Sequence, residues 1–214
     1  MVVTASRELY LEVAEAAAEL LAAPEVAAWW DEPSALAEFS VRGLAGHLAG
    51  QVFFIPEMLA QPVPAEPVIP IGEYYAQVSW IGSDLGTPFN RSIRTGGEQD
   101  AADGPAALAA EVAACVADLR SSLPAAADRP VRRPTWGLWS ISFDDFVTSR
   151  MLELVIHGDD LAYSVGLATP AFPAPAVETV VDLLSRIALR RHGPTAVLRA
   201  LSRSERAPVS ISAL

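Results

Sequence analysis

The segment from 142 to 166 has the period of a buried helix, yet it carries ionisable residues on its buried face. Ser142, with Asp145 three residues later, is a typical helix start. Four of the seven inward positions can ionise, and an ordinary core helix does not tolerate this, because a buried charge is costly without a partner. The chain must therefore fold so that this face meets groups that compensate its charges. The inward positions are Phe146, Arg150, Glu153, His157, Asp160, Leu161 and Ser164.

Glu153 and His157 stand four residues apart, so a helix projects both side chains from one face. A divalent metal ion is the cheapest partner that a buried carboxylate and a buried imidazole can share. His47 lies on the apolar stripe of another predicted helix, where a third ligand would have to be. These three residues are therefore candidate metal ligands. They leave a fourth position open, as in catalytic zinc sites, and the same donors also suit nickel, iron or manganese.

Each of these residues also has a simpler interpretation. A single histidine on an apolar face more often donates to a backbone carbonyl within the core. Glu153 and His157 could form an i,i+4 pair, but such a pair contributes only about 0.2–0.5 kcal/mol, which is too little to offset burial. Arg150 and Asp160 could pair with other buried charges, or support the ligands from behind. His192 follows two arginines at a predicted helix end, so we do not expect it to be a ligand.

The composition favours a mainly all-α protein. The 214 residues are 51% hydrophobic, which supports one substantial core, and alanine with leucine and glutamate favours helix. Four long helices with a polar cluster inside them indicate an antiparallel-type four-helix bundle whose ligand site lies among facing helices. We predict these helices over about 4–21, 40–59, 105–123 and 142–166.

The predicted bundle covers residues 1–170, and residues 171–214 form an extension packed on it. The extension contains a helix over about 175–191, then a short helix, and then a possible strand over 207–211.

The segment between the second and third bundle helices has no clear helical period. The prolines between 61 and 70 predict a stiff connector without helix. We expect a short helical piece around 74–85 and a glycine-rich polar loop at 94–97. Trp136 and Trp139 precede the last bundle helix and are expected either to anchor the core or to line the pocket.

The charge and residue types exclude several functions. The net charge of −11 argues against a nucleic-acid partner. Every basic residue is arginine, which excludes Schiff-base chemistry and a lysine general base.

The single cysteine and the hydropathy pattern narrow the class further. Cys115 excludes a disulfide framework, and its apolar surroundings indicate a small buried hydrophobic residue. No apolar stretch approaches the ~20 residues that span a bilayer, and no leader pattern is present. We therefore expect a soluble cytoplasmic protein without a membrane partner.

Three ordered motifs resemble a known family, the mycothiol-dependent maleylpyruvate isomerase N-terminal domain family within the DinB-like superfamily. The similarity spans most of the chain and is weakest over residues 62–104. The motifs are Trp30-x-x-Pro33-Ser34, then Ser40-Val41-Arg42-Gly43-Leu44-Ala45-Gly46-His47-Leu48-Ala49, then Arg150-x-x-Glu153-x-x-x-His157-Gly158-x-Asp160-Leu161-Ala162.

The resemblance implies a DinB-like four-helix bundle that binds a divalent metal ion, usually zinc. One family ligand is a His of the second helix and two form a Glu/His-x-x-x-His pair, which His47, Glu153 and His157 match. Two departures count against maleylpyruvate as the substrate. Asp159 stands where many relatives have Trp, and the isomerase carries an additional C-terminal domain, whereas only residues 167–214 follow the site helix here.

Members of the family use a low-molecular-weight thiol, mycothiol or bacillithiol, for isomerisation or thiol transfer. We therefore hypothesise a metal-dependent enzyme, with zinc as the expected metal, that activates a thiol such as mycothiol for transfer to, or isomerisation of, a small electrophilic substrate. No protein nucleophile is expected, and Arg150 and Asp160 would orient a ligand or bind the substrate. The alternatives are a metal-dependent hydrolase that uses metal-bound water and a non-catalytic metal or small-molecule binding protein.

Overall fold

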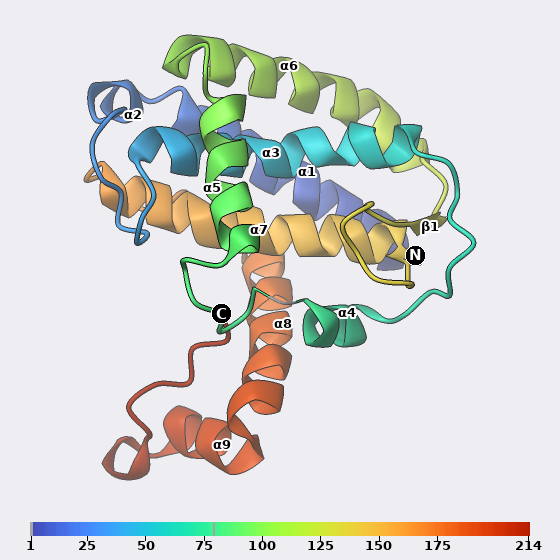
Figure 1. The fold of residues 1–214 in the computed structure, drawn as a ribbon, viewed down its shortest axis with the longest axis vertical. Coiled ribbons are helices and arrows are strands. Elements are labelled where there is room, and N and C mark those ends of the chain that lie inside the picture. Colours follow the sequence, from blue (N-terminus) through green and yellow to red (C-terminus); the bar gives the residue numbers. More distant parts are fainter. Residues whose placement is uncertain (1, 79) are drawn as a thin grey trace.

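Four long helices form the body of the protein (Figure 1). The computed structural model describes residues 2–78 and 80–214, and it describes only the backbone of residues 2–4. The helices α1 and α3 each pack against α6 and α7, and they also contact each other. The helices α1 and α7 run in one direction and α3 and α6 in the other. The predicted all-α class and bundle are confirmed. The bundle helices are α1 (Val2–Leu21), α3 (Val41–Ala60), α6 (Pro105–Ser122) and α7 (Phe143–Ser164).

The core lies between these four helices and consists of their apolar stripes. The largest completely buried side chains include Tyr10, Leu44, Ile55, Phe146 and Met151. Full burial of such an aliphatic or aromatic side chain stabilises the fold by roughly 1.5–3 kcal/mol. Within the described residues, no helix has both the length and the apolarity that a membrane span requires.

Serine side chains cap the two helices that carry the candidate ligands. The Oγ of Ser40 accepts a hydrogen bond from the Gly43 amide at 2.9 Å at the start of α3. The Oγ of Ser142 accepts from the Asp145 amide at 3.0 Å at the start of α7. Both caps satisfy backbone donors that a helix leaves open. The predicted beginnings of the two helices are therefore confirmed.

The glycine-rich loop predicted at 94–97 is wrong, because these residues belong to α5 (Pro88–Asp100). This helix crosses α3 at very short backbone distance (Figure 1). A Cβ atom on Gly46 would overlap the carbonyl oxygen of Gly97, and a Cβ on Gly97 would overlap the carbonyl of Gly43. The glycines therefore allow two helices to approach closely, which is a different use of the residue from a flexible loop.

The connector after α3 contains no helix up to Pro70, as predicted. It lies beside Ser140, whose backbone accepts from Ile69 at 2.8 Å and donates to Pro67 at 2.9 Å. The following helix, α4 (Ile71–Gln77), begins earlier and ends sooner than the piece predicted around 74–85. The carboxylate of Asp145 accepts from the Ile71 amide at 3.0 Å, which holds the start of α4 against the start of α7.

Short elements complete the bundle. The strands β1 (Pro130–Val131) and β2 (Ile141–Ser142) pair antiparallel, with Pro130 opposite Ser142, directly before α7. A five-residue helix, α2 (Pro24–Ala28), follows α1, and a 3-10 turn, η1 (Leu123–Ala125), follows α6.

The C-terminal part packs on the bundle through α8 (Ala174–His192), which contacts α1, α4 and α7. The short helix α9 (Pro194–Ser202) packs on α8, and a 3-10 turn, η2 (Ser204–Arg206), follows it. The strand predicted over 207–211 is wrong. A strand needs a neighbour to accept its hydrogen bonds, none of the described residues pairs with this segment, and Val209 is fully exposed. The division of the chain at residue 170 stays a prediction.

Candidate metal centre

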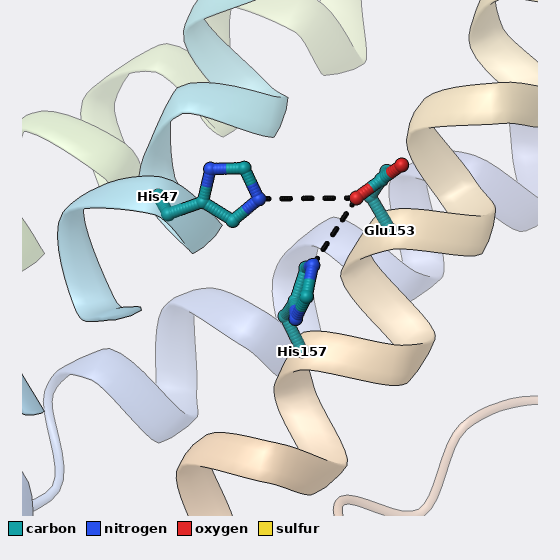
Figure 2. A group of neighbouring side chains, drawn as sticks. All are labelled: His47, Glu153 and His157. Carbon is teal, nitrogen blue, oxygen red and sulfur yellow. Dashed lines mark hydrogen bonds and ion pairs between the residues drawn. The ribbon is translucent and has the colours of Figure 1, made fainter. Parts of the chain in front are cut away.

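The three candidate ligands come together between α3 and α7 (Figure 2). His47 comes from α3, and Glu153 and His157 come from successive turns of α7. Glu153 Oε2 lies 3.2 Å from His157 Nε2 and 3.8 Å from His47 Nε2. One ligand atom from each residue lies within 4.8 Å of the other two. The structure thus assembles the predicted triad, and its binding of a metal ion stays a prediction.

The donor set and its spacing fit a small divalent ion. Two ligand atoms at zinc–ligand distances of about 2.1 Å in tetrahedral geometry would lie about 3.4 Å apart. The two separations from Glu153 Oε2, 3.2 and 3.8 Å, are close to this value. The imidazole rings meet edge to face with centroids 4.8 Å apart, and the Nε2 atom of each ring faces Glu153 Oε2 (Figure 2). Two nitrogens and one carboxylate oxygen could therefore hold zinc with little movement.

Asp160 contacts the far side of the His157 ring. Its Oδ2 lies 3.0 Å from His157 Nδ1. A carboxylate in this position accepts the Nδ1 hydrogen and leaves the Nε2 lone pair for a metal ion, which is common among metal-binding histidines. The geometry therefore agrees with the ligand-orienting role predicted for Asp160. Its neighbour Asp159 is exposed and accepts instead from the Thr169 hydroxyl.

Gln51 joins Arg150 to the centre and is absent from the predicted site residues. Arg150 Nη1 donates to Gln51 Oε1 at 2.6 Å, and Gln51 Nε2 donates to the His47 carbonyl at 2.8 Å. The same Nε2 lies 3.5 Å from His47 Nε2. The signal in the sequence is that Gln51 interrupts the apolar stripe of α3 one turn after His47, as a glutamine that is completely buried.

Burial and neighbouring charges set the protonation of the triad. Burial lowers the pKa of His47, so this ring is neutral near neutral pH. Burial alone would raise the pKa of Glu153, but hydrogen bonds to both histidines and the charge of Arg150 hold this pKa well below its usual range. Burial alone would lower the pKa of His157, but Asp160 and Glu153 raise it to about 9. Without a metal ion, His157 therefore carries a proton that a metal ion would displace.

The aromatic residues before α7 contact α4 and the first turn of α7. Trp136 and Trp139 stack with ring centroids 4.8 Å apart, and both contact Tyr74. Trp136 also lies against Phe146, with centroids 6.2 Å apart. The Arg150 guanidinium also lies over the Phe146 ring, 5.2 Å from its centroid, so the tryptophans pack on the Arg150 side of the triad. Their role as a pocket wall stays a prediction.

Cys115 lies away from the triad, on α6. It is predicted to be a small buried hydrophobic residue, and it is half-buried and packs partly against the core. Burial raises the pKa of its thiol. A neutral thiol on a different helix cannot serve as a nucleophile at the centre.

Comparisons with known proteins gave one match. The model of a family described as the mycothiol maleylpyruvate isomerase N-terminal domain matches residues 10–162. The matched segment contains His47, Glu153 and His157 and nearly all of the four bundle helices. Comparisons with curated proteins and with solved structures found no match.

Proposed function

Since the family model matches residues 10–162 of the 214, the chain belongs to the mycothiol maleylpyruvate isomerase N-terminal domain family, and we propose that it activates a small thiol at a metal ion. The family supports a mycothiol-related enzyme. We infer that the thiol, mycothiol or a close analogue, is transferred to a small electrophile or assists its isomerisation. The observation that carries the proposal is the triad of His47, Glu153 and His157 in a matched bundle.

The chain supplies three ligand atoms, Nε2 of His47, Oε2 of Glu153 and Nε2 of His157, and zinc is the expected metal. A bound divalent ion lowers the pKa of a thiol and holds the thiolate in place. Asp160 fixes the ring of His157, and the low pKa of Glu153 keeps this carboxylate ionised and ready to bind a cation. The side chains of His47 and His157 are 17% and 14% exposed, so a small ligand can reach them.

The proposal that the nucleophile is a thiol from outside the chain agrees with the lack of a lysine or cysteine nucleophile at the triad. It contains no lysine, and its single cysteine lies on α6 with a raised pKa. Among the described residues, the clustered side chains that could hold a metal are two imidazoles and a carboxylate, which are ligands rather than nucleophiles once a metal is bound. The nucleophile must therefore be a bound molecule, and the family associates this domain with mycothiol.

Metal analysis combined with a conjugation assay tests the proposal. We expect purified protein to carry about one zinc ion per chain, and to accelerate the conjugation of mycothiol to monobromobimane in a chelator-sensitive way. His47→Ala and His157→Ala should lose both the metal and the rate. His192→Ala is the matched control and should keep both the metal and the rate. His192 is the last residue of α8 and contacts the carbonyl of Ser212.

Three results would count against the proposal. Stoichiometric metal in His47→Ala and His157→Ala would show that the metal site is elsewhere. A metal-dependent hydrolysis without any thiol adduct would favour the hydrolase. Bound metal whose removal lowers the melting temperature but changes no turnover would favour a binding protein.

A further inference from the structure

Arg150 is a buried cation whose direct hydrogen-bond partners are neutral. It is only 7% exposed, Nη1 donates to Gln51, and Nε donates to the Ser149 hydroxyl at 3.2 Å. Arg150 takes part in none of the ion pairs between residues that the structure describes. A buried charge without an opposite charge in contact costs several kcal/mol. Such a cost calls for a functional explanation.

The helices packed around Arg150 present uncharged phenols to it. Tyr10 of α1 and Tyr74 and Tyr75 of α4 lie close enough to act on its pKa. Burial raises the pKa of each phenol, so all three are neutral at physiological pH. The Tyr75 hydroxyl is itself buried without a hydrogen-bond partner among the described residues.

The other charged groups near Arg150 do not neutralise it. Arg133 is a second cation close enough to interact with it, and its pKa is lowered by burial and by Arg150. Glu153, one turn further along α7, is the carboxylate that acts on the pKa of Arg150, but its Oε2 lies between two imidazoles and forms no ion pair with Arg150. Arg150 therefore has no carboxylate in direct contact among the described residues.

Gln51 links Arg150 to the metal centre through hydrogen bonds. Because its Oε1 accepts from Arg150, the amide can only turn its Nε2 towards His47. One amide hydrogen reaches the His47 carbonyl, and Nε2 stands 3.5 Å from the His47 nitrogen that faces Glu153. Gln51 is completely buried, so water does not compete for this orientation. The amide hydrogens of Gln51, backed by the guanidinium, present a positive field to the centre.

The charges around the metal centre then favour the binding of one further anion. Histidines bind a metal ion as neutral imidazoles, so His47 and His157 would add no charge to the loaded centre. The carboxylates of Glu153 and Asp160 would balance the two charges of the ion. Arg150 adds one positive charge that nothing in contact balances, and uncompensated charge is costly in a low-dielectric interior. A ligand with one negative charge would offset the charge of Arg150.

We propose that Arg150, oriented through Gln51, makes the metal centre select a monoanionic ligand over a neutral one. In the reaction this ligand is the thiolate of the small thiol. The inference rests on the proposed function for the metal site and the thiol, and it adds the residue that determines the charge of the ligand. Arg150 is then a specificity-determining residue, and Gln51 is a positioning residue that acts through it.

Anion binding to the cobalt-substituted protein tests this without measuring turnover. Azide is the monoanionic probe and imidazole the neutral probe, and the visible absorption of cobalt reports the binding of either. We expect Arg150→Met to keep one cobalt ion, to weaken azide by about 10-fold to 100-fold and to leave imidazole unchanged, because one nearby charge contributes about 1–3 kcal/mol at an effective dielectric constant near 20. Arg199→Met removes an exposed arginine of α9 and should change neither affinity.

Two further variants separate selectivity from folding. Gln51→Met should weaken azide by a smaller factor than Arg150→Met, because the cation remains but loses its orientation. Arg150→Lys should restore part of the azide affinity, because it returns the charge without the planar fork. Both readouts remain available if Arg150→Met does not fold.

The possible failures are distinguishable. Azide that binds Arg150→Met as tightly as the wild type, an equal loss for azide and imidazole, or no azide binding by the cobalt-loaded wild type would overturn this inference and leave the metal site standing. A wild-type protein that binds no metal would overturn the proposed function and this inference together.

Discussion

Two buried arginines, Arg7 and Arg150, differ in the charge of their partners. Arg7 contacts α7 from α1, and Arg150 is itself a residue of α7. Arg7 of α1 donates from Nε to the Asp144 carboxylate of α7 at 2.7 Å and from Nη1 to the backbone carbonyls of Leu123 and Ala126. Arg150 of α7 has neutral partners in contact. The first charge is balanced inside the fold and joins α1, α7 and the end of α6. The charge of Arg150 is available to interact with a bound ligand.

Burial alone does not identify a functional charge. Asp144 and Arg150 are both ionisable residues of one helix, and both are buried or nearly so. What separates them is the identity of the partner, which is an opposite charge for Asp144 and a neutral amide for Arg150. We therefore expect changes at the Arg7–Asp144 pair to act on stability, and changes around Arg150 to act on metal and ligand binding.

The largest expected effect is on the Arg7–Asp144 pair. Arg7→Met should lower the free energy of unfolding by about 3–5 kcal/mol, because it leaves a partly buried carboxylate without its partner. Denaturant unfolding of the metal-free protein measures this, with Arg120→Met as the control, since Arg120 pairs with Glu15 at the surface. The folded fraction should still bind one metal ion per chain. An Arg150→Met protein destabilised as strongly as Arg7→Met would remove the distinction between the two arginines.

The second effect concerns the carboxylate of the triad. Glu153→Gln should weaken zinc binding by at least about 100-fold, or about 3 kcal/mol, because a neutral amide replaces an ionised ligand. Competition with a chromogenic chelator measures the affinity. The metal-free protein should also lose stability, because the pKa of Glu153 is held well below its usual range and the ionised carboxylate is therefore stabilised by its neighbours in the fold. Glu57→Gln, on the exposed face of α3, is the control that should bind zinc normally.

A smaller effect is expected at Asp160, which contacts the Nδ1 side of the His157 ring. Asp160→Asn should weaken zinc binding by about 10-fold to 100-fold, because the amide oxygen holds the His157 Nδ1 hydrogen less strongly than a carboxylate does. Asp159→Asn is the matched control, since Asp159 is the neighbouring aspartate and points to Thr169 instead. Equal losses in the two variants would mean that net negative charge, and not the contact with His157, determines the affinity.

The bundle and its capped helices follow from local signals in the sequence. Ser40 and Ser142 precede apolar stripes of helical period, and both cap their helices as predicted. The triad could be proposed because three costly residues stand on two inward stripes, although only the packing of α3 on α7 brings His47 to Glu153.

Other features depend on contacts between distant residues and could not be predicted. Gly96 and Gly97 resemble a loop in isolation, but both belong to α5, and Gly97 lies against the backbone of α3, some fifty residues earlier in the chain. Likewise Arg150 has no carboxylate in contact, because its neighbours are an amide from α3 and phenols from α1 and α4. A residue's charge partner is a property of the tertiary structure, which a single sequence does not contain.

A further expected effect concerns the proton on His157, which separates the metal-free from the metal-bound state of the centre. Its pKa of about 9 lies above the ordinary value of 6.5, so the ring is protonated at neutral pH and the metal must displace that proton. Zinc affinity should therefore rise about tenfold per pH unit below pH 9 and level off above it. The same proton stabilises the metal-free fold fully below pH 6.5, and this contribution is lost as the pH rises towards 9.

Calorimetry in buffers of different ionisation enthalpy counts the protons released, and about one per zinc ion is expected near pH 7.5. Asp160→Asn should move the rise in affinity to lower pH, because the carboxylate that raises the pKa is gone. A zinc affinity that does not change between pH 6.5 and 8.5 would mean that His157 is not a ligand.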